Sequence, residues 1–285
     1  MAEVARAVNL GRICHVSATI LTLYDHMITL DQEVELIWQK RWSLLKVLFI
    51  WTRYLGDLVL ICDTCVFMLS SVPPQLCLTY VEFQSWASTI IIWTMQIIMQ
   101  FRIYAMYQWS KKIICFVAAC FIIEVAFMFA VKMVSARSGA YPDLSPIDGV
   151  HPCIYKALPD FLYSSWVAMM SYESILFSFA VWMGIKHVKE MRALRYLRGG
   201  SIFEVLIRDS SFYFMLTLST CAGMWLALPA DMFEVPEGFS IAVTTIMGCR
   251  LVLNLREEYY RPLRSTSWID AQEGELLAVE DLHFP

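Results

Sequence analysis

Ionisable side chains inside apolar stretches are the residues of this sequence best able to do chemistry. A charged side chain at the centre of a bilayer costs about 2.5–3.5 kcal/mol on insertion scales, so it normally pairs, holds a proton or meets a ligand. Five such residues lie roughly 14–20 Å along their helices, at 1.5 Å per residue, near the middle of a hydrocarbon core. They are Asp25, Arg53, Asp57, Glu124 and Glu173. We interpret them as a candidate intramembrane polar network, either structural or functional.

For part of this network, the sequence spacing indicates which cation can pair with which carboxylate. Arg53 and Asp57 are four residues apart and can pair within one helix. Arg53 also has the right depth to serve as the counter-charge of Asp25. His26 and Arg250 complete the candidate set, although the guanidinium of Arg250 lies near enough to the membrane surface to reach the headgroups. The two glutamates have no evident cationic partner.

A polar stripe indicates which side of the first apolar stretch faces other helices. His15, Thr19, Thr22, His26 and Thr29 recur at 4-3-4-3 spacing, which keeps them on one helical face. We expect this face to look into a bundle and to form interhelical hydrogen bonds of about 0.6–2 kcal/mol each. A similar polar line in the third apolar stretch comprises Ser85, Thr89, Trp93, Gln96 and Gln100.

The segment TLDQEVELIWQKRW, residues 29–42, changes character. Its apolar residues share one helical face, which indicates a short amphipathic helix at the membrane surface. Thr29 and Gln32 match a capping box at its start, and Asp31 and Glu33 suit its positive N-terminal end. The carboxylates of this segment are therefore interpreted as interfacial.

Cysteine and histidine placement narrows the remaining chemistry. Seven of the nine cysteines fall inside apolar stretches, whereas Cys77 and Cys153 fall between them on one predicted side and are candidate disulfide partners. The alternative is that both are free thiols. The five histidines are scattered, which disfavours a metal centre, and Arg250 rather than a lysine stands in the last stretch, which disfavours a retinal protein. No cofactor is expected.

The elements that position these residues follow from composition and from the lengths of the apolar runs. The 285 residues are 58% hydrophobic with a mean hydropathy of +0.55, above the apolar share of about 45–50% usual in soluble domains. Seven runs are long enough to cross a bilayer, and prolines fall only between or beyond them. The predicted spans are 13–30, 44–69, 86–107, 113–134, 161–185, 211–228 and 239–255. The fold class predicted is therefore an all-α integral membrane protein, a single seven-transmembrane helix bundle over 1–255 with a short tail at 256–285.

Basic residues predict the orientation of this bundle. Of the 22 Lys and Arg residues, fifteen fall on one side of the predicted spans and five on the other. Because cytoplasmic loops are enriched in Lys and Arg, the N-terminus is expected outside and the C-terminus in the cytosol. The net charge of -4 and the lack of a basic domain exclude nucleic acid as a partner. The expected surroundings are the lipid bilayer, of the plasma membrane or of an internal membrane.

Several motifs carry a resemblance to a known group. YDHMITLDQEVELIW is followed by WSLLKVLFIWTRY, FRIYAMY, IRDSSFYF and LVLNLRE. Together they resemble a large group of fungal seven-helix membrane proteins, known by an N-terminal domain of unknown function with a YD-x-x-x-TLD-x-EVE-x-IW signature. The resemblance implies a multi-pass membrane protein and no established activity.

Three function classes are compatible with this pattern. A receptor-like signal transducer is favoured, with an unknown small-molecule ligand outside and a basic loop, 186–208, that contacts a cytosolic partner or anionic lipid. It lacks the N-P-x-x-Y motif of rhodopsin-like receptors. A proton-coupled or small-molecule transporter is the alternative, for which the buried carboxylates would be coupling sites. An intramembrane hydrolase is the third class, and no catalytic motif supports it.

Overall fold

The computed structural model describes residues 2–69, 72–107, 110–138, 163–193, 211–217, 219 and 237–257. The regular elements within these ranges are all helical, with no strand among them. They are α1 (Ala2–Glu33), the short π-helix η1 (Val34–Trp38), α2 (Leu44–Met68), α3 (Pro74–Met106), α4 (Lys111–Ser138), α5 (Tyr163–Ala193), a helical segment at 211–217 and a helix at Glu237–Glu257, here called helix 237–257. The predicted all-α class is confirmed for this part of the chain.

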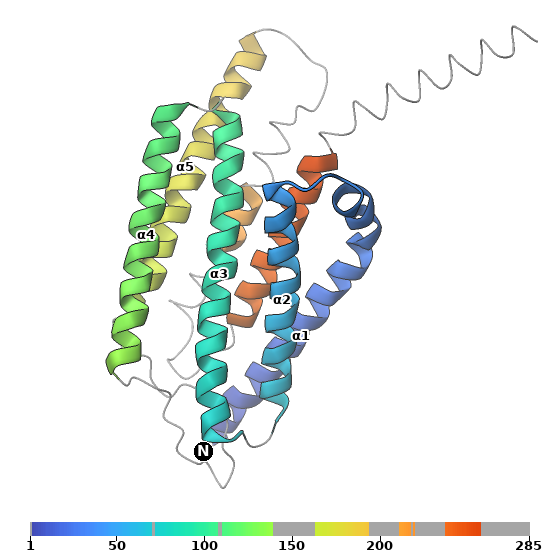
Figure 1. Cartoon of the computed structure of the whole chain (residues 1–285), viewed down its shortest axis with the longest axis vertical. Coiled ribbons are helices and arrows are strands. Elements are labelled where there is room, and N and C mark those ends of the chain that lie inside the picture. Colours follow the sequence, from blue (N-terminus) through green and yellow to red (C-terminus); the bar gives the residue numbers. More distant parts are fainter. Residues whose placement is uncertain are drawn as a thin grey trace, which may run out of the picture.

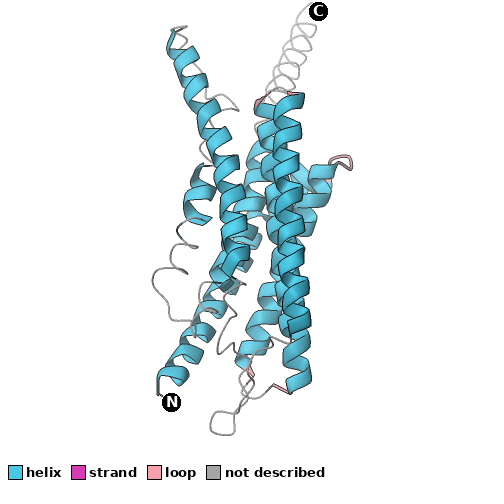
Figure 2. Ribbon diagram, turned by 90° about the vertical axis from the view of Figure 1, so that its left-hand side faces the viewer, coloured by secondary structure: helices cyan, strands magenta, loops and turns pink. Residues whose placement is uncertain are grey.

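The long helices lie side by side in one elongated bundle (Figures 1 and 2). α1 packs on α2, α2 on α3, and α3 on both α4 and α5, which also pack on each other. Helix 237–257, orange-red in Figure 1, lies against α2 and α3. Two ends of the bundle are used as landmarks below: the η1 end, where η1 connects α1 to α2, and the α2–α3 end, where α2 stops and α3 starts.

Local sequence signals explain several helix boundaries. Ser43 precedes α2 with an extended backbone, and its side chain accepts a hydrogen bond from the backbone N–H of Lys46. Pro74 occupies the first turn of α3, where its missing N–H costs nothing. α3 therefore begins twelve residues before the predicted span at 86. α1 also departs from expectation, because it continues without a break through Thr29 to Glu33 instead of restarting there.

Four helices are long and apolar enough to cross a membrane, which fits a multi-pass integral membrane protein. They are Gln75–Met106, Lys111–Ser135, Ser164–Lys186 and Glu237–Glu257, and they correspond to four of the predicted spans. α1 and α2 have the length, but the ionisable residues they carry reduce their apolar character. Of the predicted span at 211–228, only 211–217 and 219 are described. The count of seven spans and their orientation stay predictions.

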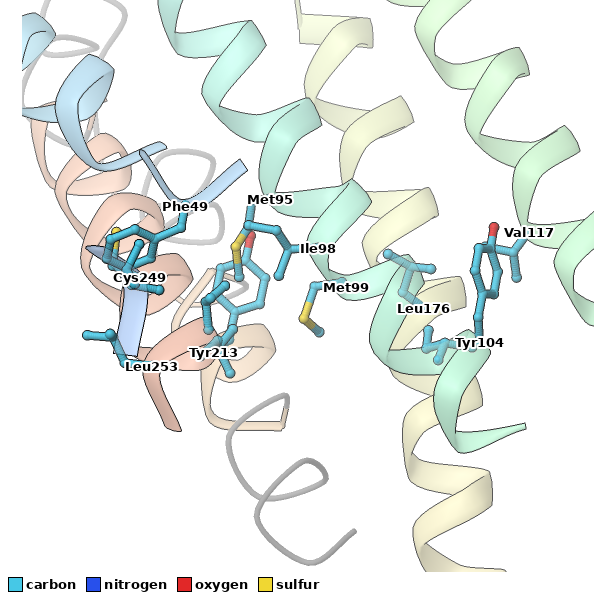
Figure 3. Packing of buried hydrophobic residues seen from close by; sticks show 14 of the residues in the cluster. Phe49, Met95, Ile98, Met99, Tyr104, Val117, Leu176, Tyr213, Cys249 and Leu253 are labelled. Atoms are coloured by element: carbon cyan, nitrogen blue, oxygen red, sulfur yellow. The ribbon is translucent and has the colours of Figure 1, made fainter. Parts of the chain in front are cut away.

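Apolar packing in the bundle is centred on α3. Figure 3 shows Met95, Ile98 and Met99 of α3 between side chains of α2 and helix 237–257 on one side and of α5 on the other. On α4, in contrast, the apolar side chains of Ile122 and Ile123 are largely exposed. An apolar helix face of this kind needs lipid or another protein to cover it. The bundle is therefore packed internally around α3 and apolar on its outside at α4.

Cys77, in the first turns of α3, is buried and disulfide-bonded. The six other cysteines in the described ranges are free, so the bonded partner lies outside those ranges. Cys153 lies there too, and its pairing with Cys77 stays a prediction.

Glycines allow helix 237–257 to approach α2 and α3 closely. A Cβ atom at Gly56 would lie 2.6 Å from Cγ2 of Thr245, and one at Gly248 would lie 2.9 Å from the sulfur of Met95. Thr245 and Met95 are fully buried and have no free space to move into. Small residues at helix contacts of this kind are typical of membrane bundles.

Gly56→Ala is therefore expected to destabilise the protein by about 1–3 kcal/mol, because the added methyl group overpacks the contact with Thr245. Thermal unfolding in detergent measures the effect. Gly11→Ala is the matched control: nothing lies within 4 Å of its Cβ position, and alanine favours helix by about 1 kcal/mol. Equal effects of the two changes would contradict the close contact, and Thr245→Ala should restore part of the stability of Gly56→Ala.

Candidate functional site

Six ionisable side chains from three helices meet in the half of the bundle nearer η1. α1 supplies Asp25, His26 and Glu33, α2 supplies Arg53 and Asp57, and helix 237–257 supplies Arg250. We call this set the ionic cluster. Five of its members belong to the set predicted from sequence, and Glu33 does not. His26 and Glu33 share a face because residues seven apart on a helix lie nearly above one another, and Asp25 adjoins His26 in the chain.

Asp25 joins two arginines that come from different helices. Nη1 of Arg53 donates to Oδ2 of Asp25 at 3.2 Å, and Nε of Arg250 donates to Oδ1 at 2.7 Å. Arg53 also donates from Nη2 to the hydroxyl of Thr29 at 2.5 Å. Asp25 and Arg53 are almost completely enclosed, whereas 47% of the Arg250 side chain is exposed. One buried carboxylate thus connects α1 to α2 and to helix 237–257.

Glu33 is the member that the sequence interpretation missed. It was assigned to an interfacial helix, but its side chain is fully buried because α1 runs on past Thr29. Its Oε1 accepts hydrogen bonds from Nε1 of Trp38 and from the hydroxyl of Tyr54, each at 2.9 Å. Its Oε2 lies 3.6 Å from Nε of Arg53. The predicted capping box is also wrong, since the hydroxyl of Thr29 donates to the carbonyl of Asp25.

A sequence signal for Glu33 was nevertheless present. The polar stripe at 4-3-4-3 spacing ends at Thr29, and one further step of four residues reaches Glu33. His15, Thr19, Thr22 and Thr29 of the stripe are buried, as is Glu33. Extending the period by one step would therefore have placed this carboxylate inside the bundle.

His26 lies between two carboxylates. Its Nδ1 is 2.5 Å from Oδ2 of Asp57, and its Nε2 is 3.6 Å from Oε2 of Glu33. The ring also meets Tyr54 edge to face. The hydrogen bond of the ring is with Asp57, and Glu33 lies farther away on its other side.

The predicted pairing within α2 is replaced in part by pairing between helices. Arg53 and Asp57 attract each other across one turn. The close contacts of Asp57 are nevertheless with His26, and those of Arg53 are with residues of α1. α1 and α2 are therefore joined by two ionic contacts at successive levels. The guanidinium of Arg250, which was expected near the headgroups, binds Asp25.

The predicted glutamates belong to a second buried group, on α3, α4 and α5. Nε2 of Gln96 donates to Oε1 of Glu124 at 2.9 Å, and the hydroxyl of Tyr213 donates to Oε1 of Glu173 at 3.2 Å. Glu173 lies close enough to Glu124 for their charged forms to repel each other. Neither glutamate contacts the ionic cluster in the described part of the chain. The network predicted from sequence is thus divided into two separate groups.

A third polar group lies toward the α2–α3 end and was not predicted. The Asp63 carboxylate accepts a hydrogen bond from the hydroxyl of Tyr80 at 2.7 Å, and its other oxygen is 3.9 Å from Nδ1 of His15. His15 also stacks on Phe67. Lys132 of α4 donates to the carbonyl and the hydroxyl of Ser85. Asp63 and Lys132 lie close to helix ends in sequence, where charges are common, so nothing distinguished them there.

Cations cap the open carbonyls at the η1 end. Arg256 donates to the carbonyl of Leu36 at 2.7 Å and to the hydroxyl of Ser43. Lys46 donates to the carbonyls of Trp38 and Lys40. Positive side chains are favourable at a helix C-terminus, where carbonyls have no partner within the helix. These contacts fix the turn that positions Glu33. Of the predicted basic loop 186–208, residues 186–193 continue α5 and the rest lies outside the described residues.

The chemistry available in the ionic cluster is the making and breaking of ionic contacts between helices. In the described ranges, no three His, Cys, Asp or Glu side chains gather in a way that could hold a metal ion. The ionic cluster can hold helices together and can release a helix when one contact opens. A helical bundle with apolar membrane-length helices and buried ionic contacts between them defines the class: a multi-pass membrane protein.

Comparison with known families gives one match. Residues 13–58 match a family of unknown function, DUF6533. The matched segment comprises most of α1, all of η1 and the first part of α2, and it holds every member of the ionic cluster except Arg250. Neither curated proteins nor solved structures gave a match. The chain is thus similar to this family over the segment that builds the ionic cluster.

Proposed function

We propose that this protein is a receptor-like signal transducer of the membrane and not an enzyme. The proposal includes seven spans, with the N-terminus outside and the C-terminus in the cytosol, and kinship with the fungal seven-helix proteins that it resembles. The observation that carries it is the double contact of Asp25 with Arg53 and Arg250. This contact joins the segment similar to the family to a helix 225 residues away in the chain.

The two arginine contacts differ in how easily they can open. Arg53 is enclosed and has further partners on α1, so its contact with Asp25 is the fixed one. Arg250 is half exposed and can exchange Asp25 for lipid headgroups or water at a smaller cost. A transducer needs an element with two arrangements of similar free energy. Movement of helix 237–257 with opening of the Asp25–Arg250 contact supplies such an element.

The remaining parts of the proposal are a ligand and a partner. A small molecule that binds one arrangement better than the other shifts the population by that difference in affinity. The basic segment 186–208, whose first residues belong to α5, lies on the cytosolic side in this proposal and would contact a cytosolic partner or anionic lipid. A proton-coupled transporter is the second candidate, favoured by the neighbouring carboxyl groups of Glu124 and Glu173.

A ligand screen with a transport measurement tests the proposal. Full-length protein in lipid nanodiscs is screened for thermal stabilisation by small molecules, where a ligand at 100 times its Kd adds about 2.7 kcal/mol. Arg250→Gln should change the affinity of a stabilising compound several-fold, whereas Arg137→Gln, on the exposed end of α4, should not. The compound should not accumulate in proteoliposomes. Saturable uptake would support the transporter, and unchanged affinity in Arg250→Gln would remove the ionic cluster from the mechanism.

The orientation is tested with terminal epitopes in intact cells. The N-terminal epitope should be accessible to antibody and the C-terminal one should not, because the basic residues favour a cytosolic C-terminus. Equal protection of both epitopes would mean an even number of spans and would contradict the seven-helix proposal.

A further inference from the structure

Gln96 and Glu124 form a buried pair that is joined by a single hydrogen bond although each side chain can make a second one. Gln96 is fully buried on α3, and Glu124 is 4% exposed on α4. Nε2 of Gln96 donates to Oε1 of Glu124 at 2.9 Å. Oε1 of Gln96 and Oε2 of Glu124 have no hydrogen-bond partner among the described residues. Buried polar atoms in proteins are rarely left without a partner.

Both unpartnered atoms are oxygens, and they belong to the two side chains that are already joined. An amide and a carboxylate can share one hydrogen bond, because a carboxylate has no donor. An amide and a carboxylic acid can share two, one in each direction. If Oε2 of Glu124 carries a proton and donates it to Oε1 of Gln96, this one proton satisfies both oxygens. The same pair of residues would then be complete without any further group.

We propose that Glu124 is a proton-binding site in the membrane, whose proton completes an acid–amide pair with Gln96 between α3 and α4. The proton comes from bulk water and returns to it, and no other bond is formed or broken. The site is separate from the proposed signalling element, so it stands whether or not the protein is a receptor. It gives the bundle a second hydrogen bond between α3 and α4 that is present when Glu124 is protonated and lost when Glu124 is ionised, while the bond from Nε2 of Gln96 remains.

The surroundings of the pair favour the protonated form. Glu173 of α5 repels a charge on Glu124, and it is held in turn by Tyr213. Tyr172 of α5 also faces Glu124, and Tyr104 and Cys120 lie around Tyr172; none of these is a cation.

Lys132 is the nearest cation of α4 on the C-terminal side of Glu124. It is eight residues further along, about 12 Å at 1.5 Å per residue. It binds Ser85. A carboxyl group that has a negative neighbour and no cation beside it favours the protonated form in a medium of low dielectric constant.

Infrared spectroscopy combined with thermal unfolding tests the proposal on full-length protein in lipid nanodiscs. The wild-type spectrum should contain the C=O stretching band of a protonated carboxyl group at neutral pH, and Glu124→Gln should lose the part of this band that comes from Glu124. Ionisation removes the hydrogen bond that Glu124 donates to Gln96. The equilibrium constant for unfolding of the wild type should therefore rise with pH, by up to about tenfold per pH unit for one proton. Glu124→Gln keeps a hydrogen-bond donor toward Gln96 but has no titratable proton, so this contribution to the pH dependence of unfolding should disappear. Asp31→Asn, at an exposed carboxylate, is the matched control and should change neither measurement.

Gln96→Leu provides a test that does not depend on the folding of Glu124→Gln. It leaves Glu124 in place and removes the amide that receives the proton. The carboxyl band should persist and move to higher frequency, because the carboxyl group loses its hydrogen bonds. A wild-type spectrum without the band, or a band unaffected by both changes, would overturn the proposal. So would an equal pH dependence of stability in wild type and Glu124→Gln.

Discussion

Asp25→Leu is expected to destabilise the protein by about 3–5 kcal/mol, because it removes the closer of the two carboxylates that neutralise the buried Arg53 and leaves only Glu33 at 3.6 Å. The guanidinium of Arg53 is 2% exposed and has no access to headgroups. The same change frees Arg250, but that side chain is half exposed and its loss of a partner costs less. Asp25→Asn should be milder, since an amide oxygen can still accept from both arginines.

Thermal and denaturant unfolding in detergent measure this effect. Asp31→Leu is the matched control, because Asp31 is an exposed carboxylate six residues further along the same helix. It should change stability by no more than about 0.5 kcal/mol. A similar effect of Asp25→Leu and Asp31→Leu would show that the Asp25 contacts contribute little.

Arg53→Leu is expected to have an effect of the same size, about 3–5 kcal/mol, because it removes the shared cation of two buried carboxylates. Asp25 would retain Arg250, whereas Glu33 would retain hydrogen bonds from Trp38 and Tyr54. The loss should be partly relieved by a second change that removes an orphaned carboxylate, Asp25→Asn or Glu33→Gln.

Double-mutant cycles quantify that relief. We expect coupling energies of about 1–3 kcal/mol between Arg53 and each of Asp25 and Glu33, which it contacts directly. Coupling to Asp57 should be smaller, because the close partner of Asp57 is His26. Strict additivity of Arg53→Leu with both Asp25→Asn and Glu33→Gln would show that Arg53 is not held by these carboxylates. A dominant coupling to Asp57 would favour pairing within α2.

Several polar positions of the segment similar to DUF6533 have a structural explanation. Asp25, Thr29 and Glu33 all meet Arg53, and Trp38 donates to Glu33. With His26 and Asp57, the segment supplies every member of the ionic cluster except Arg250, which comes from helix 237–257. A protein with this segment therefore needs a cation from a later helix, or a different partner for Asp25.

Helix content, the membrane environment and the candidate buried charges were accessible from the sequence. Four of the predicted spans correspond to helices of sufficient length and apolarity, because length and apolarity are properties of a single stretch of chain. The depth of a residue such as Asp25 or Glu124 also follows from counting along one helix. Both residues are buried as their helical positions indicate. These properties need no knowledge of neighbouring helices.

The Arg53–Asp25 pair was predicted from the sequence and is confirmed, but the other partners could be assigned only by the tertiary structure. Asp25 binds Arg250 across 225 residues, Asp57 binds His26 rather than the arginine on its own helix, and Glu124 meets Gln96. Which side chains meet depends on the rotation of each helix about its axis and on which helices are neighbours. Packing over the whole bundle decides both. Glu33 shows the same limit. Local capping signals predicted it at the membrane surface, but α1 continues to this residue and buries its side chain in the bundle.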